Sequence, residues 1–130
     1  MGSSVAAHHM AEDGGSIVNI SSRSAYGPQV KNGPYGAAKA AVRSLTGTLA
    51  VEVAPKIRVN AVAPGPEPTE DFDDCMGTDT PEKREKLLGM VGIPMGRYGE
   101  PEDIAATVVF MASPPASWIT GQCLYVTGGR

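Results

Sequence analysis

Two short apolar runs on either side of one long helical pattern constrain the fold of this chain more than any other feature. Residues 16–21 form a β-branched run with almost no alternation of apolar and polar side chains, and residues 57–63 form a second run. Strands that are covered on both faces have this character, and they belong to parallel sheets between helix layers. Over residues 34–54, apolar side chains recur at three- and four-residue spacing, which predicts a helix. Strand, helix and strand with short connectors predict one right-handed crossover unit.

The end of the chain repeats this alternation of helix and strand. Residues 101–103 are proline followed by two acids, which is typical of a helix start because the helix dipole favours negative charge there. The prolines at 114–115 predict the end of that helix, and residues 122–127 predict a third strand. Residues 5–11 are helix-permissive and predict the last turns of a further helix. The predicted fold class is α/β, a partial Rossmann-like unit with a three-stranded parallel sheet and flanking helices.

Residues 66–98 differ in character from the rest of the chain. A short helix is predicted over residues 81–90, with Asp79 or Thr80 as its cap, and glycines and prolines keep the remainder irregular. A long segment of this kind in a compact domain is often a lid or a binding loop. The acids at its start lack the spacing of a calcium loop, so we expect a solvated loop there.

Composition excludes several classes of protein. A length of 130 residues suits one domain, and a formal net charge of −3 gives no electrostatic support for a nucleic-acid or anionic-membrane partner. Cys75 and Cys123 make neither a disulfide framework nor a zinc site, and we expect no metal. No apolar run approaches the roughly 20 residues of a membrane span. We therefore expect a soluble, cytoplasmic chain that forms a single α/β unit.

Three residues are candidates for catalysis. Tyr35 and Lys39 stand one helical turn apart at the head of the long predicted helix, so both side chains can reach a common ligand. A lysine ammonium favours the tyrosinate form of a nearby phenol, which makes the tyrosine a usable general acid/base. Ser22 follows the first predicted strand, and open parallel sheets carry their sites at the ends of strands. The Tyr-x-x-x-Lys pattern is weak evidence when it stands alone.

Further motifs follow in a fixed order along the chain and add weight to this pattern. The full series is residues 17–22, Tyr35-x-x-x-Lys39, residues 58–65, residues 96–105, and residues 119–122 with the terminal Gly128-Gly129. In this order and at these spacings, the chain resembles the classical short-chain dehydrogenases/reductases over nearly its whole length.

The resemblance implies a role for each catalytic candidate. Tyr35 would be the acid/base that exchanges a proton with the substrate oxygen. Lys39 would bind the ribose hydroxyls of the nicotinamide cofactor, so Tyr35 and Lys39 both lie at the cofactor. Ser22 would donate a hydrogen bond to the substrate oxygen, and its spacing to Tyr35 favours it over Ser21.

The resemblance also places a cofactor loop and a substrate loop. The sequence Pro64-Gly65-x-x-x-Thr69 matches the family's cofactor loop, in which Thr69 would contact the nicotinamide carboxamide. Glu67 stands where the family usually has an aliphatic residue. Residues 66–98 correspond to the variable substrate loop, and the cofactor would be NAD or NADP.

One expected family motif is absent from the sequence. No strand runs into a Thr-Gly-x-x-x-Gly-x-Gly turn, which cradles the pyrophosphate in this family, and the Asn-Asn-Ala-Gly segment is absent too. We therefore expect residues 1–130 to be the C-terminal portion of such a Rossmann-fold domain, holding its fifth, sixth and seventh strands. An open sheet edge, where the fourth strand would pair, invites association, so we expect a homo-oligomer.

Two functions follow from these observations. The first is an NAD(P)-dependent oxidoreductase, which transfers hydride between a nicotinamide cofactor and a secondary alcohol or ketone as its small-molecule substrate. The second is a catalytically inactive truncated fragment that self-associates or pairs with another chain, because the phosphate cradle is absent and cofactor binding by this chain is doubtful.

Overall fold

Three parallel strands form the sheet in the order β1-β2-β3. The computed structural model describes residues 2–27, 32–68, 73–74 and 76–130. The strands are β1 (Gly15–Ile20), β2 (Ile57–Pro64) and β3 (Cys123–Val126). At their carboxyl ends Ile20 pairs with Val62, and Pro64 pairs with Val126. The predicted three-stranded parallel sheet is confirmed.

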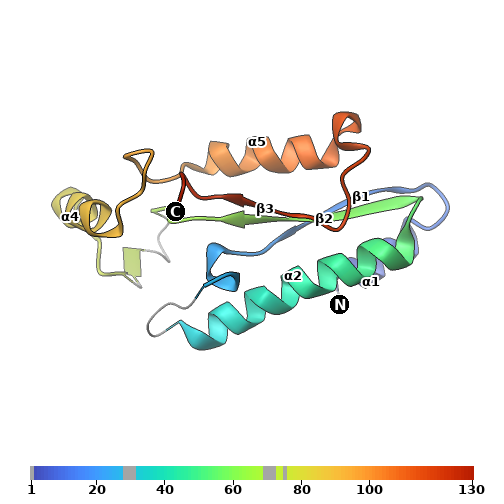
Figure 1. Cartoon of the computed structure of the whole chain (residues 1–130), viewed down its shortest axis with the longest axis horizontal. Helices are drawn as coiled ribbons and strands as arrows, with labels where there is room; N and C mark the ends of the chain where they lie inside the picture. Colours follow the sequence, from blue (N-terminus) through green and yellow to red (C-terminus); the bar gives the residue numbers. More distant parts are fainter. Residues whose placement is uncertain (1, 28–31, 69–72, 75) are drawn as a thin grey trace.

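Helices cover both faces of this sheet (Figure 1). α1 (Gly2–His9) and α2 (Gly33–Val53) lie on one face, and α5 (Pro101–Ala112) lies on the other. α4 (Pro81–Val91) projects beyond the carboxyl ends of the strands. The long predicted helix and the three shorter ones are therefore present, with ends that differ by a few residues.

The middle strand, β2, forms the centre of the core. Every side chain from Val59 to Ala63 is fully buried, because α2 and α5 cover the two faces of the strand. Asn60 is the polar exception, and its amide is satisfied: Nδ2 donates to the Ile119 carbonyl at 2.8 Å, and Oδ1 accepts from the Gln122 amide at 3.0 Å. A buried amide that finds both partners joins β2 to the turn before β3.

The helix ends follow the predicted signals. Thr80 is the cap of α4, because its side chain accepts from the Lys83 amide, whereas Asp79 pairs with the Lys83 ammonium. At the start of α5, Asp103 and Glu100 form a capping box behind the proline at the first turn. These helix ends could be predicted from the sequence because each capping signal acts within a single turn of helix.

Two short 3-10 helices are not predicted by the sequence patterns. η1 (Arg23–Ala25) follows β1 and packs against α2, and η2 (Pro114–Ala116) follows α5. The prolines at 114–115 do end α5, as predicted, and the chain continues into η2. Within the described ranges no helix is both long enough and apolar enough to cross a membrane.

Candidate active site

Two adjacent serines at the end of β1 have different hydrogen bonds. Ser21 is 2% exposed, and its Oγ donates to the Lys39 carbonyl at 2.9 Å, so this hydroxyl ties β1 to α2. Ser22 is the cap of η1, and its Oγ accepts from the Ser24 amide at 3.2 Å. A hydroxyl that accepts from the backbone still has its own O–H proton to donate. The hydroxyl proton of Ser21 is used in the bond to α2, whereas the hydroxyl of Ser22 makes no bond to α2 among the described residues.

Lys39 joins the start of α2 to the end of β1. Its Nζ donates to the carbonyl of Ile20, the last residue of β1, at 3.1 Å. The same Nζ lies 5.6 Å from the centroid of the Tyr35 ring, within the range of a cation–π contact. The Tyr35 side chain is 48% exposed. The structure therefore brings Tyr35 and Lys39 together at the carboxyl end of β1, two residues before Ser22.

A glycine between the two residues lets α2 approach the segment after β1. A Cβ at Gly36 would lie 3.0 Å from the Ser24 carbonyl oxygen, tighter than nearly all real contacts. Asn32, the cap of α2, donates from Nδ2 to the Ser24 Oγ at 3.1 Å. The sequence Tyr-Gly-x-x-Lys thus places the catalytic candidates on a helix end that lies directly against η1, a contact that the sequence did not predict.

The predicted cofactor loop begins at the carboxyl end of β2. The Gly65 amide donates to the Val126 carbonyl at 2.8 Å, and a Cβ at Gly65 would lie 2.7 Å from the Thr127 Cα. Only glycine permits this approach of the loop to the end of β3. Pro66 accepts from the Gly99 amide at 3.1 Å. Thr69, the predicted carboxamide contact, lies outside the described residues, as does Cys75.

The site is open to solvent in this chain. One recess of about 140 Å³ lies between the start of α5 and the end of β3, and a wider one lies between α2 and β3. Neither is lined by Ser22, Tyr35 or Lys39. Among the described residues no group of three or more His, Cys, Asp or Glu side chains could hold a metal ion. At this carboxyl edge of the sheet Tyr35 is exposed, and Ser22 and Lys39 are half-buried.

The donors at this edge fit a nicotinamide nucleoside. An ammonium has three N–H donors, and Lys39 uses one of them on the Ile20 carbonyl, which leaves donors for ribose hydroxyls. The half-exposed Tyr35 leaves room for a ring beside it.

An ion pair that sequence reasoning did not predict fixes the segment before α5. The Arg97 guanidinium binds the Asp103 carboxylate with both terminal nitrogens, at 2.7 and 2.9 Å. These bonds and the Glu100 amide lower the pKa of Asp103 to about 2. The motif over residues 96–105 contained both partners, but nothing in the spacing indicated that they pair.

Sequence comparison finds relatives along the whole chain. The family model described as "Enoyl-(Acyl carrier protein) reductase" matches residues 1–130. The chain is similar to 4-formylbenzenesulfonate dehydrogenase of Comamonas testosteroni (43% identity over 125 residues) and to glucose 1-dehydrogenase 2 of Bacillus subtilis (strain 168) (39% over 132 residues). These matches cover 94% and 99% of this chain and 49% of each relative. The chain thus spans about half the length of the curated relatives it matches.

Comparison of folds agrees with the sequence comparison. The chain is similar to the structure of 7α-hydroxysteroid dehydrogenase complexed with NADH and 7-oxoglycochenodeoxycholic acid, with a TM-score of 0.82 and 37% identity. The match covers 95% of this chain and 47% of that one. It confirms the predicted α/β architecture and the resemblance stated from the motifs.

Proposed function

The chain belongs to the short-chain dehydrogenase/reductase family of oxidoreductases, and from that premise we propose that it carries the catalytic residues of an NAD(P)-dependent dehydrogenase or reductase. In this proposal residues 1–130 are the C-terminal portion of the Rossmann-fold domain. The reaction is hydride transfer between the cofactor and a secondary alcohol or ketone. Ser22 and Tyr35 act on the oxygen of that small-molecule substrate, and Lys39 acts on the cofactor ribose and on Tyr35.

The observation that carries this proposal is the position of Lys39. Its Nζ is held by the Ile20 carbonyl at 3.1 Å and lies 5.6 Å from the centroid of the Tyr35 ring. A positive charge fixed at this place stabilises negative charge that develops on the tyrosine oxygen during proton transfer. A lysine with a merely structural role would not need to lie over the ring of a half-exposed tyrosine.

Each of the three residues has its own role in the proposed reaction. Tyr35 supplies or removes the proton, as a general acid or base. Ser22 donates its O–H to the substrate oxygen as well. Its Oγ accepts a hydrogen bond from the Ser24 amide, and this bond does not use the hydroxyl proton. Lys39 holds the ribose hydroxyls with its remaining N–H donors, and Pro64, Gly65 and Thr69 have the proposed role of binding the cofactor. When bound, the nicotinamide supplies or accepts the hydride.

Replacement of the tyrosine hydroxyl tests the proposal. In the protein in which this chain occurs, Tyr35→Phe should lower turnover by roughly 10²–10⁴-fold, the usual contribution of general acid–base catalysis. The assay follows NADH and NADPH absorbance with a panel of secondary alcohols and ketones. Tyr26→Phe is the matched control, because it also loses one phenol hydroxyl and keeps the edge-to-face ring contact with Tyr125. Full activity in Tyr35→Phe would contradict the assignment.

A second function is favoured by the outer edge of β1. In the described part of the chain β1 pairs with β2 alone, and Ile20 at the end of that strand is 45% exposed. An unpaired edge recruits another strand. The chain would then be a self-associating module, or a partner for a second chain, without cofactor binding of its own.

Light scattering after size exclusion tests this second function. The chain should elute as a dimer or larger assembly, and Ile20→Lys should shift it toward the monomer, because a lysine at a sheet edge opposes pairing. Val51→Lys adds the same charge on the exposed side of α2, where the side chain is 82% exposed, and serves as the control. A clean monomer would contradict self-association. Micromolar binding of NADH or NADPH in a calorimetric titration would contradict the inactive-module reading.

A further inference from the structure

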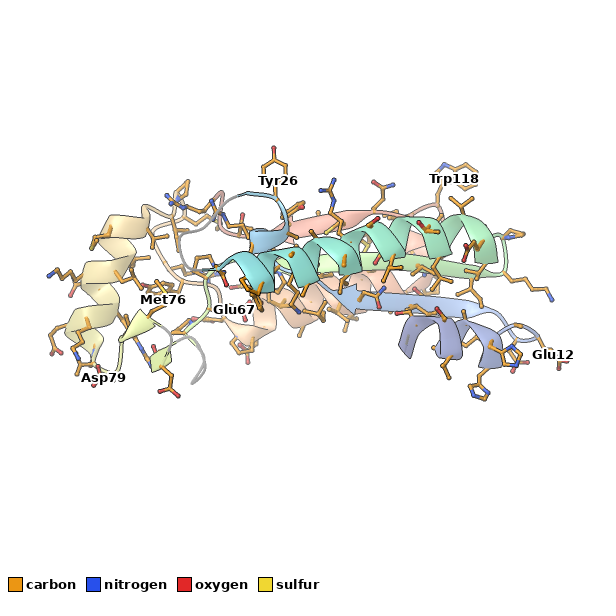
Figure 2. The ribbon with its side chains drawn as sticks, turned by 90° about the horizontal axis from the view of Figure 1, so that it is seen from below. Glu12, Tyr26, Glu67, Met76, Asp79 and Trp118 are labelled. Atoms are coloured by element: carbon orange, nitrogen blue, oxygen red, sulfur yellow. The ribbon has the colours of Figure 1, made fainter. Side chains whose placement is uncertain are left out.

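Glu67 is a half-buried acid, with one buried carboxyl oxygen, that the proposed reaction does not use. It lies in the loop after β2, and Figure 2 shows it at the junction between the body of the molecule and the projecting α4. Its Oε1 is buried and has no hydrogen-bond partner among the described residues. Its Cγ lies 3.2 Å from the position that a Cβ at Gly99 would occupy. The side chain is thus packed beneath the segment that leads into α5.

The charges around Glu67 offer it no compensation. Asp103 on α5 faces it and is an anion, with a pKa of about 2. The cation that pairs with Asp103 is Arg97, and its guanidinium also binds the Tyr98 carbonyl. Glu100, the cap of α5, adds a further acid, and the Tyr98 hydroxyl donates to a carbonyl of α4. Burial, and then the charge of Asp103, raise the pKa of Glu67 above its ordinary value of 4.5.

Main-chain hydrogen bonds attach the loop that carries Glu67 to the segment before α5 and to the end of β3. Pro66 accepts from Gly99 at 3.1 Å, and Gly65 donates to Val126 at 2.8 Å. Burial of an unpartnered neutral carboxyl beneath Gly99 costs less free energy than burial of an ionised one, which is strongly disfavoured there. Since the pKa of the docked group is raised, its contribution to docking is complete below pH 4.5 and is lost as pH rises through the raised pKa.

We propose that Glu67 is a positioning residue: the loop over residues 64–68 stays packed against Gly99 while the Glu67 carboxyl is neutral, and loss of its proton releases the loop. The loop adjoins the carboxyl end of β2, so its release would alter one wall of the cofactor site. That consequence rests on the proposed function, whereas the docking of the loop does not.

A pH titration by NMR tests the proposal on the chain without cofactor or substrate. From below pH 4.5 to neutrality, the amide signals of Gly65 and Gly99 should move with one midpoint, and the Glu67 carboxyl carbon should titrate with the same midpoint, above 4.5. Glu67→Gln is isosteric and neutral, so its two glycine amides should keep the low-pH positions throughout. Glu102→Gln removes an exposed acid from the first turn of α5 and should leave the transition unchanged.

Two results would overturn the proposal. One is a Glu67 carboxyl that titrates while the amides of Gly65 and Gly99 stay still. The other is a Glu67→Gln chain whose amides show the same transition as the unaltered chain. Because the sample holds neither cofactor nor substrate, either result leaves the proposed hydride transfer standing, and a failure of hydride transfer leaves the docking result standing.

Discussion

The catalytic candidates and α4 lie at the same end of the sheet but are held there in different ways. Ser21 and Lys39 attach the start of α2 to β1 through bonds to main-chain carbonyls, and β1 in turn pairs with the fully buried β2. In α4 no residue is buried. Its connections are made by polar side chains: Arg84 binds the Asp73 carboxylate, and the Tyr98 hydroxyl donates to the Arg84 carbonyl at 2.9 Å.

The two regions therefore differ in what fixes their positions. The position of the catalytic candidates depends on the sheet and changes only if the core changes. The position of α4 depends on a few surface contacts, so it can change while the core stays intact. A site built in this way keeps its chemistry on a rigid scaffold and leaves the neighbouring segment free to differ.

The largest expected effect is in the core, at Asn60. Asn60→Ala leaves the Ile119 carbonyl and the Gln122 amide without their partner, and two such losses should cost about 2–4 kcal/mol of unfolding free energy. Urea unfolding followed by circular dichroism measures it. Gln122→Ala removes an exposed amide side chain and should change stability by less than about 0.5 kcal/mol. Equal effects of the two variants would refute the idea that the Asn60 amide anchors the turn before β3 to β2.

A smaller effect is expected at Gly65, on the border between the two regions. Gly65→Ala places a Cβ 2.7 Å from the Thr127 Cα, and overpacking of this kind should cost about 1–3 kcal/mol. Gly47→Ala, in α2 with no atom within 4 Å of its Cβ position, should instead stabilise by about 0.5–1 kcal/mol. Thermal unfolding of both variants gives the comparison. If Gly65→Ala were as stable as the unaltered chain, the close approach of the loop to β3 would not matter for folding.

The smallest effect on global stability is expected in α4. Arg84→Gln removes the pairing with Asp73 and the bond to the Thr78 carbonyl, so hydrogen exchange should accelerate in α4 while exchange in α2 stays unchanged. Lys86→Gln, an exposed residue of the same helix, is the control and should leave both helices unaffected. A parallel loss of protection in α2 would show that the two regions are coupled, contrary to the comparison above.

Much of the fold could be predicted from local patterns. The apolar run of β1, the three- and four-residue spacing along α2 and the proline-led start of α5 each indicate an element within a single window of sequence. The two 3-10 helices could not be predicted in the same way. η1 packs against α2, and this contact forms only once the intervening segment has folded back.

Part of the candidate site could be predicted from the sequence, and part could not. The spacing of Tyr35 and Lys39 already placed them on one helical face, and the structure then brings Lys39 to the end of β1. The different bonding of Ser21 and Ser22 could not be derived from two identical side chains in succession. It follows from which hydroxyl faces the Lys39 carbonyl once α2 is packed on the sheet.

The sequence by itself determined the helices and strands and the one-turn spacing of Tyr35 and Lys39, because these depend on interactions between residues close in the chain. Tertiary structure alone decided that one carboxyl oxygen of Glu67 is buried without a partner among the described residues and that Arg97 pairs with Asp103. Glu67 packs beneath a glycine far along the chain, and burial there depends on how β2, β3 and α5 come together. Desolvation and charge pairing arise from the three-dimensional surroundings of a group, which no single window of sequence contains.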